Sequence, residues 1–369
     1  MKLREIHIKG YKSIDGDVGQ SIRFGDVTVL LGANGSGKSN LVSLFTMLNS
    51  MRNDILNHYV GKYGVNSLLF YGPKKTKSIS FDMQFESDEG NIIYSIELSH
   101  GLINLFVKNE KIKIHKKNGS QQKVFFLTDN EDKPVRKKAA GNYSRSVYNF
   151  LSGIRTYQFH DTSDTAKIKD RAYVDDAKYL RHDGGNLAAF LKMLQGHAPY
   201  VKYYDRIIRH IQRVMPQFAD FDLESIPGAE NYVRLNWKDS SGSDYLLDPH
   251  QISDGSLRFM ALATLLLQPP ALLPKFIVLD EPELGLHPDA IEELGGFVRI
   301  AAQNTQVLLA TQSTRLVDEF SPEELVIVER DEQNHCSIFK KLDTEQLEDW
   351  LERYCLSELW EKNVLGGQP

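Results

Sequence analysis

The chain of 369 residues contains only two cysteines, Cys336 and Cys355. They form no C-x-x-C pair and show no zinc-ligand spacing, so neither a disulfide framework nor a structural zinc site is expected. A long apolar run is also missing, because the most apolar stretch, 259–267, ends at a Pro-Pro pair and is too short to span a bilayer. The opening residues, MKLREIHIKGYKS, contain no apolar signal-peptide core. We therefore expect a protein of the reducing cytoplasm with no membrane partner.

The sequence has no excess of positive charge. Its 44 lysines and arginines are outnumbered by 49 acidic residues, for a net charge of -5. This balance argues against a uniformly basic nucleic-acid binder but leaves room for local basic patches. Neither an internal repeat nor a sustained heptad pattern is present, which excludes a solenoid and a long coiled-coil arm. The length and the 41% hydrophobic content indicate a soluble globular protein with two or three sub-domains.

The most informative stretch is 27–48, VTVLLGANGSGKSNLVSLFTML. Residues 27–31 are a β-branched and leucine run, which is typical of a buried strand. Residues 32–39, GANGSGKS, fit the pattern G-x-x-x-x-G-K-[ST] at each fixed position. Residues 40–48 then carry apolar side chains at helical spacing. A chance glycine-rich turn is the alternative, but this strand–loop–helix order favours a phosphate-binding loop.

Such a loop binds phosphate mainly through its backbone. Glycines let successive N–H groups point at phosphate oxygens, and the helix N-terminus adds a partial positive charge. Lys38 is expected to reach the β- and γ-phosphates, and the Ser39 hydroxyl to hold Mg²⁺. The loop therefore predicts a bound nucleotide together with Mg²⁺. The predicted nucleotide-binding residues are Gly32, Asn34, Gly35, Ser36, Gly37, Lys38, Ser39 and Asn40.

Two further elements follow in the second half of the chain. In 276–283, FIVLDEPE, four apolar strand residues precede Asp280 and Glu281. A strand-end aspartate suits Mg²⁺ held beside Ser39, and the adjacent glutamate can act as general base on the attacking water. Upstream, 252–256 (ISDGS) precedes an apolar helix, and taken alone this turn is an N-cap.

The order GANGSGKSN, ISDGS, FIVLDEPELGLHP, LLATQS resembles the ABC-like head ATPases of the RecF and SMC kind. Within that group the chain looks most like the stand-alone RecF-like bacterial ATPases. These share stretches similar to YQFHDTSDTA (157–166) and DGGNLAAFL (183–191), and an ending similar to LSELWEKNVLGGQP (356–369). The resemblance covers nearly the whole chain. It implies an α/β P-loop NTPase fold, namely an ABC-type ATPase head with an inserted antiparallel β-meander and a helical second lobe.

The resemblance also assigns roles by position. It makes 32–40 the Walker A loop, Asp280 and Glu281 the Walker B pair, and 285–288 the subunit-contacting D-loop. Ser253 and Gly255 match the signature loop, which contacts the γ-phosphate held by the opposite subunit. Gln158 is the candidate Q-loop residue, with His160 close enough to compete. Catalytic roles are thus expected for Glu281, Lys38 and Gln312, and Mg²⁺ contacts for Ser39, Asp280 and Gln158.

One departure from the wider ABC pattern concerns Gln312, which stands where a switch histidine is usual. A glutamine can hydrogen-bond the γ-phosphate but cannot carry a positive charge. Slow hydrolysis, or control by a partner, is therefore expected.

Alternating apolar and polar residues predict a β-meander over 78–128, with a hairpin turn at 88–91 and a strand over 102–107. Residues 22–24 and 27–31 are expected to complete a small sheet ahead of the phosphate loop. The predicted lobes are a nucleotide-binding lobe, 1–160 with 251–369, and an inserted, mainly helical lobe, 161–250. Lysines of the meander either contact DNA phosphates or keep edge strands from aggregating. The candidate DNA contacts are Lys111, Lys113, Lys116 and Lys117.

The resemblance implies an ATP-driven switch in which two copies sandwich two ATP molecules and hydrolysis separates them. It further implies work on DNA, in repair or in defence against foreign DNA. The alternative is a regulatory ATPase subunit that controls a separate effector such as a nuclease, since the sequence itself contains no nuclease motif. A transporter ATPase is a third option, which the meander and the missing switch histidine disfavour.

Overall fold

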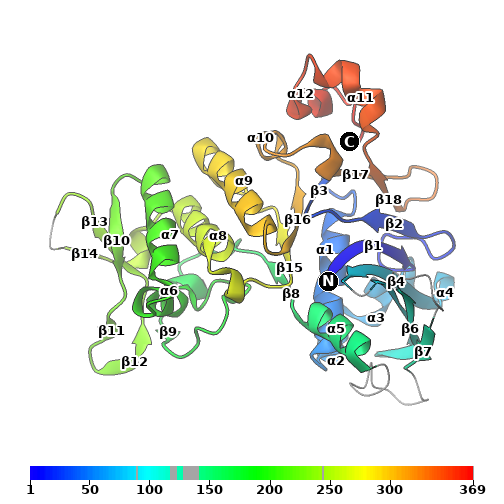
Figure 1. The fold of residues 1–369 in the computed structure, drawn as a ribbon, viewed down its shortest axis with the longest axis horizontal. Coiled ribbons are helices and arrows are strands. Elements are labelled where there is room, and N and C mark those ends of the chain that lie inside the picture. Colours follow the sequence, from blue (N-terminus) through cyan, green and yellow to red (C-terminus); the bar gives the residue numbers. More distant parts are fainter. Residues whose placement is uncertain (89, 117–122, 128–140, 243–244, 369) are drawn as a thin grey trace. The chain divides into compact units, whose positions relative to one another are not determined.

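The computed structural model describes residues 1–368 apart from 89, 117–122, 128–140 and 243–244 (Figure 1). The chain divides into two compact units, Met1–Arg155 with Ser321–Pro369, and Thr156–Phe320. The phosphate loop lies in the first unit, and the Asp280–Glu281 pair lies in the second. Each unit is described in turn.

An antiparallel sheet forms much of the first unit, in the strand order β2-β1-β4-β5-β6-β7. β4 shows why these residues pair as strands, because it alternates buried Ile79, Phe81, Met83 and Phe85 with more exposed side chains. The β-meander predicted from the alternation is therefore confirmed. The six strands are β1 (Lys2–Lys9), β2 (Gln20–Arg23), β4 (Ser78–Ser87), β5 (Gly90–His100), β6 (Leu105–Lys116) and β7 (Lys123–Phe126).

Two details of the predicted strands are wrong. β3 (Val27–Leu31) does not join β2; it pairs in parallel with β17 (Leu325–Arg330), which is antiparallel to β18 (Ser337–Lys341). All five residues of β3 are buried, and such a strand needs cover on both faces, which a two-sided alternating sheet does not give. The predicted strand at 102–107 also begins too early, because Leu102 lies fully exposed in the turn between β5 and β6.

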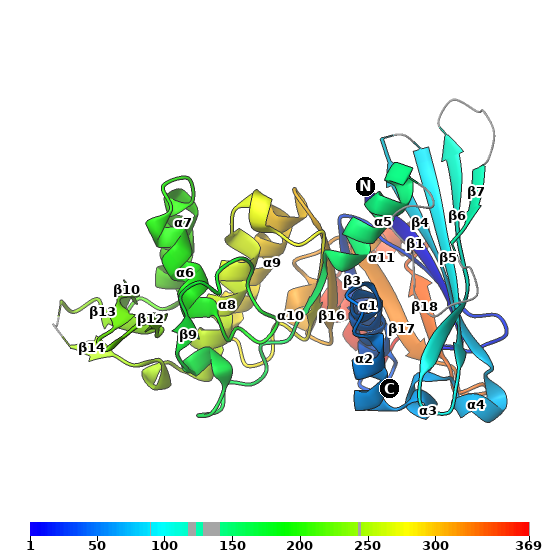
Figure 2. The ribbon, with the colours of Figure 1, turned by 90° about the horizontal axis from the view of Figure 1, so that it is seen from below.

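Seven helices in the described part of the first unit accompany its strands. α1 (Lys38–Arg52) buries Leu41, Leu44 and Phe45, which confirms the helix predicted from the apolar spacing. α5 (Gly141–Ser152) lies beside the antiparallel sheet, as Figure 2 shows, and its Phe150 ring packs edge-on against Phe85 at 5.1 Å. The other helices are α2 (Leu56–Tyr63), α3 (Val65–Leu68), α4 (Gly72–Lys75), α11 (Thr344–Leu351) and α12 (Leu356–Glu361).

The second unit begins within β8 (Ile154–Tyr157) and is built on a parallel strand pair. β15 (Phe276–Asp280) pairs with β16 (Gln306–Thr311) in a register that sets Asp280 opposite Ala310. Because parallel strands end at the same edge, the polar residues that follow both strands meet there. Its helices are α6 (Leu187–Gly196), α7 (Val201–Val214), α8 (Asp254–Leu267), α9 (Pro288–Ala302) and α10 (Thr314–Val317).

α8 is the central helix of this unit and packs against both α7 and α9 (Figure 1). Ten of its residues are buried, which matches a helix that is apolar nearly all round. Two small sheets complete the unit: β10 (Phe218–Asp222), β13 (Asn236–Asp239) and β14 (Leu246–Leu247), and β9 (Ala172–Tyr173), β11 (Ser225–Ile226) and β12 (Ala229–Val233). No helix in the described ranges is both long and apolar enough to cross a membrane.

Candidate functional site

The phosphate loop connects β3 to α1 in the first unit. Lys38 is buried, and its Nζ donates to the carbonyl oxygens of Gly32 at 2.6 Å and Ala33 at 3.0 Å. Asn34, Gly35 and Ser39 are exposed. The loop thus holds its own lysine with neutral carbonyls, and a phosphate oxygen placed there would offer the ammonium a much stronger, charged partner.

A polar cluster supports the loop from β18. Gly37 has φ 118°, and a Cβ at this position would collide with the Ser337 side chain, so glycine is required on both counts. Ser337 Oγ donates to the Ser36 carbonyl at 2.6 Å and lies 2.7 Å from Ser13 Oγ. Asn40 Nδ2 donates to the same Ser13 hydroxyl at 2.7 Å. No sequence pattern indicated Ser337, which lies 301 residues after Ser36 in the chain.

A pocket of about 460 Å³ opens beside Asn40. Of the six non-glycine residues with positive φ in the described part of the chain, three line it: Lys12, Tyr71 and His335. Such a conformation costs on the order of 1 kcal/mol or more and tends to persist at functional sites. Lys12 Nζ lies 5.4 Å from the centroid of the Tyr63 ring, and burial lowers the pKa of this lysine. The lining residues are Lys12, Ser13, Asn40, Tyr63, Ser67, Phe70, Tyr71, Arg330 and His335.

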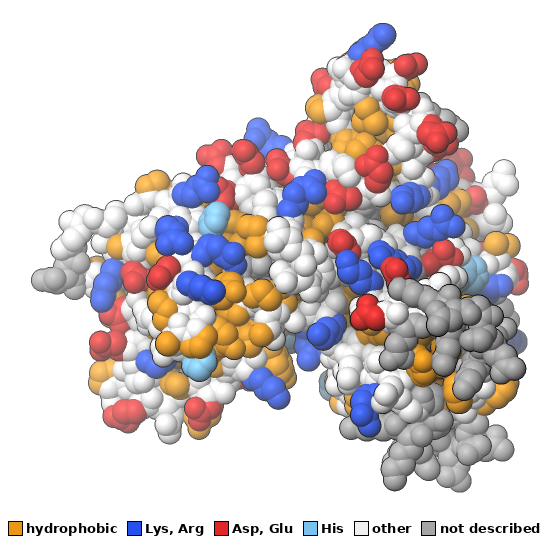
Figure 3. All heavy atoms as spheres, in the orientation of Figure 1, with side chains coloured by type: hydrophobic (Ala, Val, Ile, Leu, Met, Phe, Trp, Pro, Cys, Tyr) orange, Lys and Arg blue, Asp and Glu red, His pale blue; other side chains and the backbone are white. Residues whose placement is uncertain are grey.

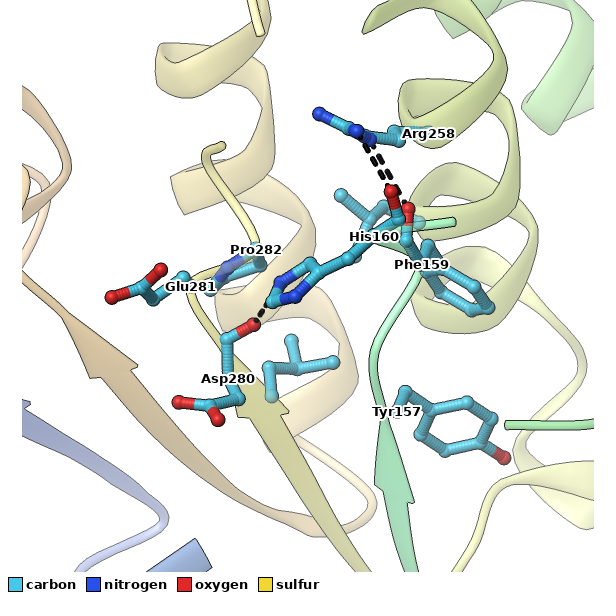
Figure 4. A pocket seen from close by; sticks show the side chains of 9 residues that line it. Tyr157, Phe159, His160, Arg258, Asp280, Glu281 and Pro282 are labelled. Atoms are coloured by element: carbon cyan, nitrogen blue, oxygen red, sulfur yellow. Dashed lines mark hydrogen bonds between the residues drawn. The ribbon is translucent and has the colours of Figure 1, made fainter. Parts of the chain in front are cut away.

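In the second unit, Asp280 ends β15 and is buried. Its carboxylate accepts a hydrogen bond from Gln158 Nε2 at 3.0 Å. The His160 ring instead bonds the backbone carbonyl of Asp280 at 2.9 Å, so its Nε2 carries the proton (Figure 4). Both candidate Q-loop residues therefore touch Asp280, but only Gln158 contacts the carboxylate.

The edge where β15 and β16 end brings Glu281 and Gln312 together. Gln312 Nε2 donates to Glu281 Oε1 at 3.3 Å, and Glu281 itself has φ 45°. Its N–H donates to the Ala310 carbonyl at 2.8 Å, which fixes this strained residue to the neighbouring strand. Nearby, Thr311 Oγ1 donates to Glu283 at 2.5 Å, and burial raises the pKa of the Glu283 carboxyl.

The signature-loop residues lie at the start of α8. Ser253 caps this helix, its Oγ accepting from the Ser256 N–H at 3.2 Å, and it remains exposed. Gly255 packs so closely on the Gly285 carbonyl that a Cβ there would collide with it. Within one chain, the cap predicted from the sequence is thus present, and the loop is held against residues 285–288.

Arg258 was not predicted from the sequence. Its guanidinium donates to the carbonyls of Phe159 at 3.1 Å and His160 at 2.9 Å (Figure 4). It also donates to the carbonyl of Leu284 at 2.8 Å. It therefore connects α8 to the Gln158 segment and to the turn after Glu281. The available signal was a single cation in an otherwise apolar helix, 257–267.

The candidate DNA contacts lie on β6. Lys111 and Lys113 alternate with buried Ile112 and Ile114, so they point to the face of the sheet away from the core. That face also carries an ion pair between Lys108 and Glu97 at 2.9 Å. More generally, side chains of both charge signs are interspersed on the side of the molecule drawn in Figure 3. Lys117 and the side chain of Lys116 lie outside the described residues.

A phosphate loop after β3, a buried aspartate and a glutamate after β15, and a glutamine after β16 define a P-loop ATPase head of the ABC type. Residues 27–318 match the family described as "AAA domain, putative AbiEii toxin, Type IV TA system". The chain belongs to this family. No curated protein matches the sequence.

Among the solved structures that share the fold are two SMC heads. One is an SMC head bound to the C-winged helix domain of ScpA, with a TM-score of 0.60 and 14% identity over 95% of this chain and 100% of that chain. The other is an SMC head domain with an extended coiled coil, bound to the C-terminal domain of ScpA derived from Pyrococcus furiosus. Its TM-score is 0.55, with 14% identity over 95% of this chain and 98% of that chain. These likenesses confirm the predicted fold class and the resemblance to SMC-type heads.

Proposed function

We propose that this protein is a slow Mg-ATP-hydrolysing switch that dimerises around ATP. The observation that carries the proposal is the strand-end cluster of the second unit. There Gln158 contacts the Asp280 carboxylate at 3.0 Å, and Gln312 contacts the Glu281 carboxylate at 3.3 Å. Membership of an AAA family supports ATP as the nucleotide.

Each residue then has a chemical role. Lys38 exchanges its loop carbonyls for the β- and γ-phosphates. The Ser39 hydroxyl and the Asp280 carboxylate are oxygen ligands of the kind Mg²⁺ prefers, and the ion neutralises phosphate charge when bound. Gln158 turns its amide nitrogen to Asp280, which leaves its amide oxygen for the ion or its water. The nucleotide-binding lobe is, in this proposal, 1–160 with 251–369.

Glu281 is the proposed general base, since its carboxylate can take the proton of the attacking water. Gln312 orients that carboxylate through its amide N–H. Because glutamine is neutral, it adds no positive charge at the developing transition state, which is the physical reason to expect slow turnover.

The pocket beside Asn40 is the proposed place for the nucleoside. Asn40 follows Ser39 directly, so a chain of phosphates held by the loop would lead to this pocket. Its volume of about 460 Å³ falls within the usual range for small-ligand sites, and the aromatic residues Tyr63 and Tyr71 are among those that line it.

The proposed output is dimerisation through Ser253 and Gly255, which leave an exposed turn for a second copy. Action on DNA, in repair or in defence against foreign DNA, is the further part of the proposal, and it rests on the resemblance of the sequence motifs. A separate effector protein is the alternative output. The solved SMC heads bound to ScpA domains support that alternative by analogy.

The test uses Glu281→Gln, which keeps the side-chain shape but cannot accept the proton of water. Hydrolysis should slow by about 10²-fold or more, while Mg-ATP still binds. Because hydrolysis is the exit from the ATP-bound dimer, the variant should accumulate as a dimer in Mg-ATP. Light scattering after size exclusion, with and without Mg-ATP, measures this directly.

Two control variants separate the steps. Lys38→Ala should lose Mg-ATP binding in calorimetric titration while keeping its fold. Ser253→Arg added to Glu281→Gln should keep nucleotide binding but return the protein to monomer, since a bulky cation would block the signature turn. A Glu281→Gln protein that binds ATP yet stays monomeric at high concentration would argue against the self-dimer and favour a separate partner.

A further inference from the structure

The segment after α12 contacts the phosphate loop itself. The Ala33 N–H donates to the Gly367 carbonyl at 2.9 Å, and the Gly367 N–H donates to Glu329 Oε1 at 3.0 Å. Glu329 in turn pairs with Lys340 at 2.5 Å. We call residues 365–368 the brace. The ending of the chain was singled out in the sequence only by resemblance, and nothing in the proposed chemistry uses it.

The brace fits its place closely. Gly367 has φ 81°, and a Cβ there would come within 2.8 Å of Ile327 Cγ2 and 3.6 Å of Gly32 Cα. Leu365 is buried, and Gln368 Nε2 donates to the Trp360 carbonyl at 3.1 Å. Both hydrogen-bonding groups of Gly367 are used, one toward β17 and one toward the loop. The contact is therefore specific, and larger side chains cannot adopt it without a shift.

The contact falls at the point of the loop that holds Lys38. The Ala33 residue donates its N–H to the brace and accepts Lys38 Nζ at its carbonyl. A continuous chain of hydrogen bonds thus runs from Glu329 through Gly367 and Ala33 to Lys38. On its other side the first turn of the loop meets β17, because a Cβ on Gly32 would collide with the Val328 carbonyl.

We propose that the brace is a positioning element for nucleotide binding: it fixes the first turn of the phosphate loop, so that the loop presents its N–H groups and Lys38 in a binding-ready arrangement. This inference rests on the proposed ATP site. It assigns no contact with ATP to the brace. Preorganisation of this kind raises affinity because the loop loses less freedom on binding.

The test variant is Gly367→Ala. The Cβ should displace the brace from Ile327 and break the bond to Ala33, so Mg-ATP should bind about 3- to 10-fold more weakly, as expected for one lost hydrogen bond. KM for ATP should rise by a similar factor while kcat at saturation stays at the wild-type value, because the brace contacts the phosphate loop, β17 and α12, and the proposed general base belongs to the other unit. Inorganic tripolyphosphate should lose affinity equally, since the effect is on the loop.

Gly228→Ala is the matched control, because Gly228 has φ 77° and a Cβ there meets no atom within 4 Å. This substitution introduces the same backbone strain without a new contact, so the affinities for Mg-ATP and for inorganic tripolyphosphate should both stay unchanged. Glu329→Gln is a second variant that weakens the acceptor of the Gly367 N–H without changing shape, and it should also weaken Mg-ATP binding. If Gly367→Ala and Glu329→Gln both bind Mg-ATP with wild-type affinity, the proposal that the brace positions the phosphate loop is overturned. A wild-type protein that does not bind Mg-ATP would instead refute the proposed function.

Discussion

Replacing Arg258 with methionine removes the donors that serve three backbone carbonyls. The guanidinium bonds Phe159 and His160 on one side and Leu284 on the other, at 2.8 to 3.1 Å. Methionine keeps most of the aliphatic length and suits a helix, so the change isolates the hydrogen bonds rather than α8 itself.

The size of the effect follows from how exposed these groups are. A hydrogen bond to a charged donor contributes about 1.5–3 kcal/mol when buried, but Arg258 is only half-buried and water can reach the carbonyls. We take about 1 kcal/mol for each carbonyl, and so roughly 3 kcal/mol for the change. In a unit of this size that corresponds to a fall in Tm of about 6–12 °C.

Function should suffer separately from stability. His160 lies two residues after Gln158, and Leu284 lies three residues after Glu281, so the segments that carry the proposed Q-loop residue and the proposed general base lose the same anchor. A displacement of about 1 Å at such groups lowers the rate by up to about 10²-fold. We expect kcat to fall about 10- to 100-fold while the Kd for Mg-ATP changes little, because the three carbonyls belong to the segments of Gln158 and Glu281 and not to the phosphate loop.

Differential scanning fluorimetry and a steady-state ATPase assay measure the two effects. Arg258→Lys should fall between wild type and Arg258→Met, since an ammonium cannot reach all three carbonyls. Arg299→Met is the control: Arg299 donates to the Glu319 carbonyl at 2.7 Å, outside the Gln158 and Glu281 segments, and its loss should leave kcat unchanged. If Arg258→Met melts like wild type, the hydrogen bonds do not stabilise the unit. A lowered Tm with wild-type kcat would make Arg258 purely structural.

Two further predictions concern ligands. Tyr71→Ala should lower the affinity for Mg-ATP by about 5-fold or more, which is the contribution of one stacked ring, and leave the affinity for inorganic tripolyphosphate unchanged. If calorimetric titration shows that both ligands lose affinity equally, the nucleoside binds elsewhere. Replacing Lys111 and Lys113 with glutamine should weaken binding to any DNA sequence and lower the salt slope by up to about 0.9 per phosphate contact. An unchanged slope would make them solvated residues of β6, like Lys108 of the same strand, which pairs with Glu97.

Short-range patterns predicted much of this protein because the physics they report is local. The strand at 27–31, the glycine-rich loop and the helix from Lys38 follow from side-chain size, backbone freedom and apolar spacing within about twenty residues. The same holds for most of the β-meander, whose alternation predicts the face of residues in β4 and β5, whereas a bulge between Glu97 and Leu98 in the β5–β6 pairing interrupts the alternation in β6. The motif order further indicated the ATPase head before any geometry was known.

Tertiary structure decided the pairings that no local pattern encodes. β3 joins β17 because a strand buried on both faces pairs with whichever distant strand completes its hydrogen bonds and its burial. Ser337 likewise contacts Ser36 although 301 residues separate them in the chain. Arg258 and Gly367 act through backbone carbonyls, which every residue type possesses, and N–H groups, which all residue types except proline possess, so their partners leave no signature in the sequence. What the sequence determined by itself is the chemistry of each segment; the three-dimensional packing determined which segments support one another.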